Sequence, residues 1–196
     1  MNNPQVIVLS GPSGVGKDTV LHKLRLIDQS RHYVVTVTTR QPRAGEENGV
    51  AYHFLSDSEF QKMLQEGELI EWAKVYDNWY GVPKQEVRKG LLNGQDVIIK
   101  VDIQGAATIK KLIPQAILIC ITSPSHEELL RRLCERGTES DKELHLRTET
   151  AKEELSNLSI FDHIVINHRN QVDATVSEIN AIIELEKKKK CIKITL

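Results

Sequence analysis

VIVLSGPSGVGKDTVLHKLRL, residues 6–26, decides the fold of this chain of 196 residues. The stretch begins with a β-branched apolar run at 6–9, turns at a glycine-rich segment and continues with Val20, Leu21 and Leu24 at helical spacing. This order predicts a strand, a loop and a helix. The loop has the spacing GxxxxGK, and its position between a strand and a helix is the context that a phosphate-binding loop requires.

The glycine-rich loop is predicted to hold the phosphates of ATP. Its glycines let backbone N–H groups turn inward around an anion, the helix N-terminus adds a partial positive charge, and Lys17 reaches the β and γ phosphates. A turn that merely caps a helix needs no lysine there. The ATP-binding residues predicted from this stretch are Gly11, Pro12, Ser13, Gly14, Val15, Gly16, Lys17, Asp18 and Thr19.

Asp18 occupies the position where serine or threonine normally follows the lysine and places a hydroxyl on Mg²⁺. A carboxylate beside a triphosphate is electrostatically unfavourable unless a cation lies between them. We therefore take Asp18 as a hypothetical metal ligand, with Mg²⁺ as the cofactor that accompanies ATP. Thr19 offers a hydroxyl nearby.

The composition argues against several classes of protein. Hydrophobic residues make up 40% of the chain, charged residues 27%, and the formal net charge is -1, so neither a nucleic acid polymer nor a membrane is an expected partner. Cys120, Cys134 and Cys191 form no CxxC pair, and the chain shows no signal peptide, so we expect a cytoplasmic protein. The lysines at 187–190 can form a basic patch or complement the dipole of a helix end.

Strand and helix patterns alternate along most of the chain. Apolar runs at 97–101, 116–121 and 163–166 are typical of strands buried on both faces, and 33–37 is their expected companion. Helical patterns lie at 104–112, 125–135 and 171–189. This alternation predicts an α/β fold, a single domain with a parallel five-stranded sheet flanked by helices.

One region interrupts the alternation. Between Arg40 and Val82 the chain is rich in glycine, charge and aromatic residues, with a short alternating piece at 51–55 and a helical stretch at 57–66. We interpret it as an inserted, mostly antiparallel lobe that closes over a substrate. A second irregular piece, at 135–142, joins two charged helices and suits a small mobile lid.

Several further groups of polar and aromatic residues surround these elements. They are TTRQPRAGE (38–46), Gly49, YHF (52–54), IEW (70–72), NWYG (78–81) and VDIQG (101–105). Together with the loop, these motifs resemble the guanylate kinase family over nearly the full chain. The resemblance implies a P-loop kinase fold and an enzyme of purine nucleotide metabolism that transfers a phosphoryl group from ATP to GMP or dGMP.

The resemblance also implies how the single domain, 1–196, is divided. Its parts would be a core of 1–36, 83–134 and 143–196, a GMP-binding lobe of 37–82 and a lid of 135–142. ATP and GMP are the expected partners of a monomer or a homodimer.

The acceptor site rests on charge and hydrogen-bonding chemistry. Arg40 and Arg43 precede a turn and can form bidentate bonds to a monophosphate, while Tyr52 and Tyr80 add phenolic donors. Guanine presents N1–H and N2–H₂ donors, so a carboxylate is the natural group to recognise it. Taken alone, Arg43 or Glu46 can equally be a solvated charge on a loop.

By the resemblance, Glu71 and Asp102 recognise the guanine, Thr36 offers a hydroxyl to its edge, and Glu46 helps to hold the arginines. The residues expected to bind GMP are Thr36, Arg40, Arg43, Glu46, Tyr52, Glu71, Tyr80 and Asp102.

Two positions depart from the family's pattern. Val82 stands where the family usually has serine or threonine, so selectivity for guanine is expected to be relaxed. Lys100 stands where the family usually has a carboxylate that helps to organise Mg²⁺. We hypothesise a compensating exchange, in which the ammonium of Lys100 pairs with Asp18 or with phosphate. In the alternative, Lys100 extends to the sheet edge and Asp18 faces water.

Phosphoryl transfer depends on positioning and positive charge, because its transition state is loose and its equatorial oxygens carry the charge. The resemblance places Arg132, Arg136 and Arg147 over the triphosphate and Asn167 beside the adenine. The residues expected to be catalytic are Lys17, Arg40, Arg132, Arg136 and Arg147. The seven histidines show no spacing typical of metal ligands.

Two other functions stay open. One is a P-loop kinase of a phosphorylated sugar, because some such kinases also carry aspartate after the loop lysine. The other is a non-catalytic guanylate kinase-like module that binds phosphopeptides through the arginine pair. Such modules typically lose the loop lysine, which this chain keeps as Lys17.

Overall fold

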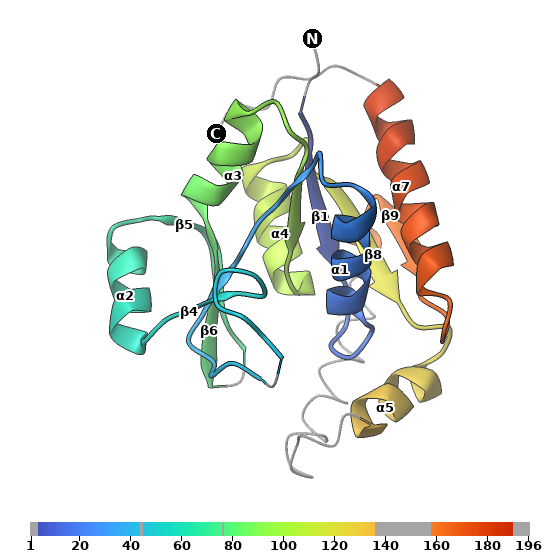
Figure 1. The fold of residues 1–196 in the computed structure, drawn as a ribbon, viewed down its shortest axis with the longest axis horizontal. Helices are drawn as coiled ribbons and strands as arrows, with labels where there is room; N and C mark the ends of the chain where they lie inside the picture. The colour runs from blue at the N-terminus through green and yellow to red at the C-terminus, as the bar shows by residue number, and fades with distance from the viewer. Residues whose placement is uncertain (1–3, 44, 76, 136–157, 190–196) are drawn as a thin grey trace.

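The structure, a computed structural model, describes residues 4–43, 45–75, 77–135 and 158–189. The described residues form two sheets (Figure 1), one with strand order β2-β7-β1-β8-β9 and one with strand order β4-β3-β6-β5. The pairings in the first sheet are all parallel. The predicted α/β fold with a five-stranded parallel sheet is confirmed.

β1 (Val6–Ser10) lies at the centre of the parallel sheet, between β7 (Val97–Lys100) and β8 (Ile117–Thr122). The edges are β2 (His32–Tyr33) and β9 (His163–Ile166). All five residues of β1 are buried, because helices cover both faces of the sheet. This burial is the physical reason for the unbroken apolar run in the sequence.

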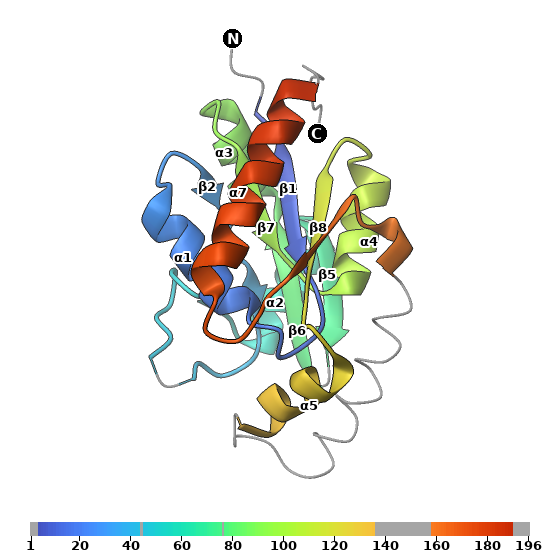
Figure 2. The same cartoon turned by 90° about the vertical axis from the view of Figure 1, so that its right-hand side faces the viewer.

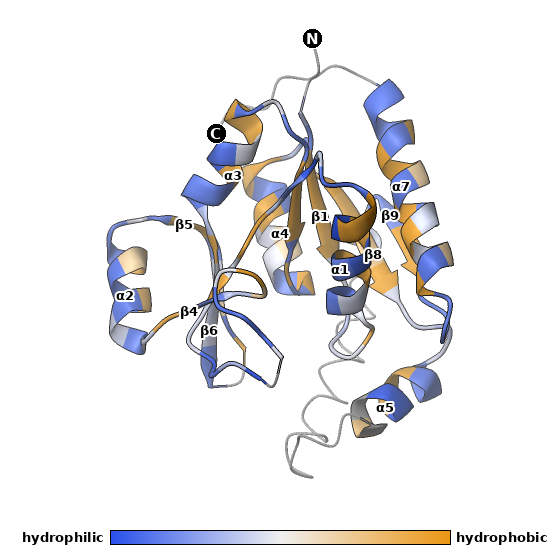
Figure 3. Ribbon diagram, in the orientation of Figure 1, coloured by the Kyte–Doolittle hydropathy of each residue, from blue (hydrophilic) through white to orange (hydrophobic). Residues whose placement is uncertain are grey.

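The two faces of β1 belong to two different cores. The helices that cover the sheet are α1 (Lys17–Ile27), α7 (Val172–Lys189), α3 (Lys84–Leu92) and α4 (Ile103–Leu112). Ile7 and Leu9 pack with α1 and α7, whereas Val6 and Val8 pack with α3 and α4. Figure 2 shows α7 and α4 on opposite sides of the sheet, and Figure 3 shows apolar strands between helices with hydrophilic outer surfaces.

The second sheet is mostly antiparallel, as the sequence predicts for this region. Its strands are β3 (Val37–Thr38), β4 (His53–Phe54), β5 (Leu69–Val75) and β6 (Asn78–Pro83). β6 pairs antiparallel with both β3 and β5, while β3 and β4 are parallel. α2 (Asp57–Gln65) starts at a capping box formed by Ser56 and Glu59 and packs Phe60 against this sheet.

The prediction of one strand at 33–37 is wrong. Tyr33 ends β2 in the parallel sheet, and Val37 begins β3 in the other sheet. Between them, the carbonyl of Thr36 accepts a hydrogen bond of 2.9 Å from the main-chain N–H of His53. The chain therefore changes sheet inside an apolar stretch. α3 was also not among the predicted helices, because only a few apolar residues interrupt its polar sequence.

The end of the chain adds α5 (His126–Glu135) after β8 and a short helical turn, η1 (Leu158–Ile160), before β9. The predicted lid at 135–142 lies outside the described residues from residue 136 onward. Arg136 and Arg147 lie outside them as well. Among the residues that the structure does describe, no helix is long and apolar enough to cross a membrane.

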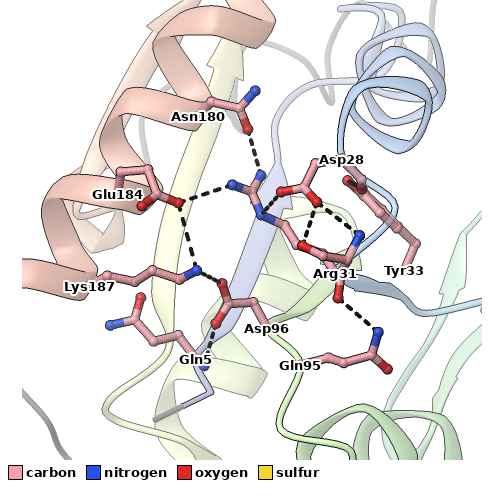
Figure 4. Close-up of polar contacts among 10 residues, drawn as sticks. Gln5, Asp28, Arg31, Tyr33, Gln95, Asp96, Asn180, Glu184 and Lys187 are labelled. Carbon is pink, nitrogen blue, oxygen red and sulfur yellow. Dashed lines mark hydrogen bonds and ion pairs between the residues drawn. The ribbon is translucent and has the colours of Figure 1, made fainter. Parts of the chain in front are cut away.

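A cluster of charged and polar residues joins α7 to the amino ends of the strands (Figure 4). We call it the Arg31 cluster; its members are Asp28, Arg31, Asp96, Asn180, Glu184 and Lys187. The guanidinium of Arg31 lies 2.5 Å from Asn180 Oδ1, 3.1 Å from Asp28 Oδ2 and 3.4 Å from Glu184 Oε1. Lys187 pairs with Asp96 at 2.6 Å, so two ion pairs hold α7 against the sheet.

Candidate active site

The glycine-rich loop connects β1 to α1 at the carboxyl edge of the parallel sheet, where α/β proteins commonly bind ligands. Gly11 and Gly16 have φ angles of 143° and 96°, which side chains disfavour. A Cβ on Gly11 would lie 2.0 Å from the carbonyl oxygen of Ile121. Lys17 begins α1, and its ammonium donates to the carbonyls of Gly11 at 2.5 Å and Pro12 at 3.0 Å.

The loop is supported by two residues predicted to bind ATP or to act in catalysis. The amide of Asn167 donates to the carbonyl of Val15 at 2.8 Å and accepts from Thr175 Oγ1 at 3.0 Å. The guanidinium of Arg132 donates to the carbonyls of Asn167 at 2.9 Å and Val15 at 3.4 Å. These bonds set the shape of the loop. Thr175, which binds Asn167, was missed because nothing in a helical pattern marks it.

A cavity of about 420 Å³ lies between this loop and the second sheet. The predicted residues that line it are Ser13, Gly14, Val15, Gly16, Lys17, Asp18, Thr36, Arg43, Tyr52, Glu71, Tyr80 and Asp102. The predicted residues that do not line it are Gly11, Pro12, Thr19, Arg40, Glu46, Arg132 and Asn167. One cavity thus brings the phosphate loop together with most of the predicted acceptor residues.

The two acceptor arginines differ in position. Arg43 lines the cavity, whereas Arg40 donates to both carboxylate oxygens of Glu46, at 2.9 and 3.0 Å. Glu46 also accepts from the main-chain N–H of Arg43 at 2.8 Å. Burial acts to lower the pKa of Arg40, but Glu46 and Tyr80 together outweigh it and the pKa is raised. Arg40 therefore keeps its charge next to the ring of Tyr52, whose centroid is 5.5 Å away.

Two carboxyl groups meet on the wall of the cavity. Asp102 is the N-cap of α4, and its side chain accepts from the N–H of Gly105 at 2.7 Å. Glu71, on β5, is only 5% exposed. Burial, reinforced by the nearby Asp102, raises the pKa of Glu71 to about 8. Glu71 is therefore protonated at neutral pH. A ligand that donates hydrogen bonds to the ionised carboxylate would lower the pKa of Glu71 and favour loss of its proton. Val82 lines the same wall and offers no hydrogen bond.

Asp18 and Lys100 form an ion pair, which confirms the predicted pairing. The ammonium of Lys100 also donates to the hydroxyl of Tyr52 at 3.0 Å and lies 4.3 Å from the centroid of its ring. Only 10% of the Lys100 side chain is exposed, so the alternative in which it extends to the sheet edge is wrong, although the Asp18 side chain is 65% exposed. Burial acts to lower the pKa of Lys100, but Tyr52 and Asp18 outweigh it and raise the pKa. The side chain is an ammonium at neutral pH.

No group of three or more histidine, cysteine, aspartate or glutamate side chains that could hold a metal occurs within 4–43, 45–75, 77–135 and 158–189. Mg²⁺ at nucleotide sites commonly needs less, because one or two carboxylates act together with phosphate oxygens and water. Asp18 is 65% exposed and lines the cavity at the loop. Its carboxylate fits this smaller donor set.

Comparisons with known proteins agree with this geometry. The family model described as guanylate kinase matches residues 3–186. The chain is 46% identical over 182 residues to a guanylate kinase of Caldanaerobacter subterraneus subsp. tengcongensis, covering 93% of this chain and 87% of the relative. It is 44% identical over 179 residues to a guanylate kinase of Thermobifida fusca, covering 91% and 90%.

A solved structure is similar over the same length. The crystal structure of guanylate kinase from Anaplasma phagocytophilum superimposes with a TM-score of 0.80 at 31% identity, covering 97% of this chain and 89% of that one. Family model, relatives and solved structure all span nearly the whole chain. The chain belongs to the guanylate kinase family.

Proposed function

We propose that this chain carries out the guanylate kinase reaction, in which ATP and GMP give ADP and GDP, inside the cavity between the phosphate loop and the second sheet. The observation that supports this most is the set of residues that line this one cavity. Lys17 lines it at the loop, Arg43 lines it at the expected phosphate position, and Glu71 and Asp102 line it where guanine donors would need acceptors. dGMP is a second acceptor in this proposal.

On the donor side, the main-chain amides of the loop and Lys17 bind the β and γ phosphates of ATP. Lys17 would leave the carbonyls of Gly11 and Pro12, which its ammonium now contacts, for the more negative phosphate oxygens. Asn167 and Arg132 hold the loop through Val15. Contact between Asn167 and adenine would require its amide to leave Val15. We retain Arg132, Arg136 and Arg147 as residues that neutralise the triphosphate.

On the acceptor side, Arg43 and Arg40 bind the monophosphate, with Tyr52 and Tyr80 as further donors. Glu46 holds both arginines in place through its bonds to the Arg40 guanidinium and the Arg43 main chain. Glu71 and Asp102 accept from the guanine N1–H and N2–H₂ groups, and Thr36 bonds the base edge. Adenine lacks this donor pattern, so it would leave buried carboxyl groups without partners.

Mg²⁺ is part of this proposal. Asp18 would hold it together with phosphate oxygens and water, and the ion would contribute positive charge to the transferred group. No covalent intermediate is needed, since positioning and charge account for most of the catalysis in phosphoryl transfer.

A coupled assay of ADP formation tests the proposed function. The acceptors are GMP, dGMP, AMP and ribose phosphates, each with and without Mg²⁺. We expect ADP mainly with GMP and dGMP, at most slow turnover with AMP because Val82 relaxes the selectivity for guanine, and no ADP without Mg²⁺. Turnover with ribose phosphates would instead indicate a kinase of phosphorylated sugars, and binding of GMP without any turnover would indicate a non-catalytic module.

We further propose that the protein acts in the cytoplasm, as a monomer or a homodimer. Cys120 and Cys134 are free cysteines, which suits a reducing compartment. Cytoplasmic ATP and GMP would then reach the cavity directly.

A further inference from the structure

Lys100 lines the cavity, and the proposed function leaves its ammonium without a role. It is the last residue of β7 and lies opposite Leu9 of β1, directly before the phosphate loop. From there the side chain reaches Asp18 at the start of α1 and Tyr52 in the region that precedes β4. It therefore lies between the donor side and the acceptor side of the cavity.

Burying the charge of Lys100 costs hydration. The ammonium keeps its charge there because the carboxylate of Asp18 and the hydroxyl of Tyr52 lie against it and offset that cost. Replacing buried ion pairs by apolar side chains is often neutral or even stabilising. Stability of the fold alone therefore does not require a charged group at this position.

The surroundings of Lys100 suit a ligand anion that replaces Asp18 better than a permanent pairing with Asp18. Asp18, its ionic partner, is 65% exposed and can turn toward solvent or a metal ion, whereas the Lys100 side chain is 10% exposed and lines the cavity. Two lysines of the lining, Lys17 and Lys100, flank the loop, and Arg43 lines the acceptor side. A phosphoryl group that passes between donor and acceptor would cross the space that these three cations border.

We propose that Lys100 is a further catalytic residue, whose ammonium leaves Asp18 and contacts the phosphoryl group as it passes from ATP to the acceptor monophosphate. This inference rests on the proposed function of the same cavity. The bound anion is a transferring phosphoryl group, and Lys100 acts by positive charge rather than by proton transfer.

In this step an oxygen of the acceptor monophosphate forms a bond to the γ-phosphorus. The bond between that phosphorus and the β–γ bridging oxygen breaks, and ADP leaves with the electron pair. Lys100 keeps its proton throughout. Its charge offsets the negative charge on the equatorial oxygens, which is the largest electrostatic demand of the reaction.

The test removes the charge of Lys100 in two backgrounds, the parent protein and a variant in which the Asp18 carboxylate is replaced by an amide. The variants are Lys100→Met, Lys100→Arg, Asp18→Asn and the double variant Asp18→Asn with Lys100→Met, and Lys111→Met on the exposed side of α4 is the control. Steady-state kinetics give kcat and both KM values. Calorimetry in EDTA gives GMP affinity without metal, and thermal unfolding shows that each variant is folded.

We expect Lys100→Met to lower kcat by about a hundredfold, with smaller changes in both KM values and in GMP affinity. Lys100→Arg should recover part of kcat, and Lys111→Met should behave like the parent protein. If Lys100 only neutralises Asp18, the double variant will have the same kcat as Asp18→Asn, and that result would overturn the proposal. A kcat ratio of about a hundred between these two variants would support it.

Two further outcomes are decisive. A loss that appears only in GMP affinity would make Lys100 a binding residue and contradict the proposal. If Lys100→Met does not fold, the proposal requires that Lys100→Arg still folds and keeps a measurable kcat. If Lys100→Met does fold, a kcat equal to that of the parent protein would refute the role of Lys100. If the parent protein forms no ADP with GMP, the proposed function fails first and this inference fails with it.

Discussion

Charged residues gather at both ends of the parallel sheet, and the two groups differ in how their charges are satisfied. At the amino ends, the Arg31 cluster surrounds the Arg31 side chain, which is only 4% exposed, with partners from α7 and from the chain around β2 (Figure 4). At the carboxyl ends, Glu71, Asp102 and Lys100 line a cavity. The charges of the first group pair with one another within the protein, whereas the second contains groups whose best partners would be a ligand.

The pKa values of two carboxyl groups express this difference. Burial acts to raise the pKa of Asp28, but hydrogen bonds from Ser30 and the charge of Arg31 outweigh it, so the pKa is lowered. Burial raises the pKa of Glu71 to about 8. Ionised Asp28 therefore stabilises the fold above its unfolded pKa of 3.8, and that contribution is lost as pH falls. The protonated carboxyl group of Glu71 contributes stability that is fully present below pH 4.5, its unfolded pKa, and is lost as pH rises toward about 8.

A buried charge in this protein has to be judged by its partners. A charge with partners on several elements holds the fold together, and a charge that faces a cavity at the expense of stability is a candidate for function. Substitutions at the two ends should therefore affect different properties of the protein.

The largest effect is expected at the carboxyl end, from Lys17→Met. Lys17 lines the cavity at the proposed phosphate position, where its ammonium donates to the carbonyls of Gly11 and Pro12, so kcat should fall by at least about a thousandfold. The coupled assay measures kcat, and Lys111→Met, on the exposed side of α4, is again the control. A Lys17→Met variant with near-parent kcat would contradict the proposal that the loop and Lys17 bind the phosphates of ATP.

At the amino end, Arg31→Met should lower the free energy of unfolding by about 3 kcal/mol, because Asp28 and Glu184 would lose their shared cation. Urea denaturation measures this change, with Arg88→Met on the surface of α3 as a control. At a temperature where the variant is folded, kcat should match the parent value. A fall in kcat there would show that the two ends are coupled.

Glu71→Gln tests the acceptor side. The amide cannot accept from guanine as a carboxylate does, so KM for GMP should rise by about a hundredfold while the folded state keeps or gains stability at pH 8. Glu68→Gln, an exposed neighbour at the start of β5, serves as the matched control. Equal GMP affinity in the Glu71→Gln variant and the parent would rule out Glu71 as the guanine acceptor.

The smallest expected effect is the dependence of GMP affinity on pH. Because Glu71 is protonated below its pKa of about 8 and guanine favours the ionised form, binding must release a proton. Affinity should therefore rise about tenfold between pH 6.5 and 8 and then level off. Calorimetry in two buffers with different ionisation enthalpies would detect the proton. In Glu71→Gln the affinity should be nearly flat over this range, and a flat profile in the parent would contradict the assignment.

Local sequence patterns predicted most of the fold. The apolar run before the glycine-rich loop became β1, and the helical spacing after it became α1. The stretch at 33–37 could not be predicted correctly, because an apolar run indicates burial but not the sheet in which it is buried. Here two buried pieces, His32–Tyr33 and Val37–Thr38, pair in different sheets.

The site was predicted in part. Charge balance, together with the departure of Lys100 from the family's pattern, suggested the pairing of Asp18 with Lys100, since a buried ammonium needs a partner. Spacing could not show that Asn167 supports the loop through Val15, a contact between residues 152 positions apart. It also could not show that Arg43 lines the cavity while Arg40 is bound by Glu46.

Local backbone preferences and side-chain chemistry are written in the sequence, so it specified most of the strands and helices, the glycine-rich loop between β1 and α1, and the residues proposed to recognise the substrates. Only the tertiary structure decided which side chains share a cavity, that Glu71 has a pKa of about 8, and that the Arg31 cluster joins α7 to the sheet. Burial and partners decide such properties, and both arise from segments that are distant in sequence and meet only when the chain folds.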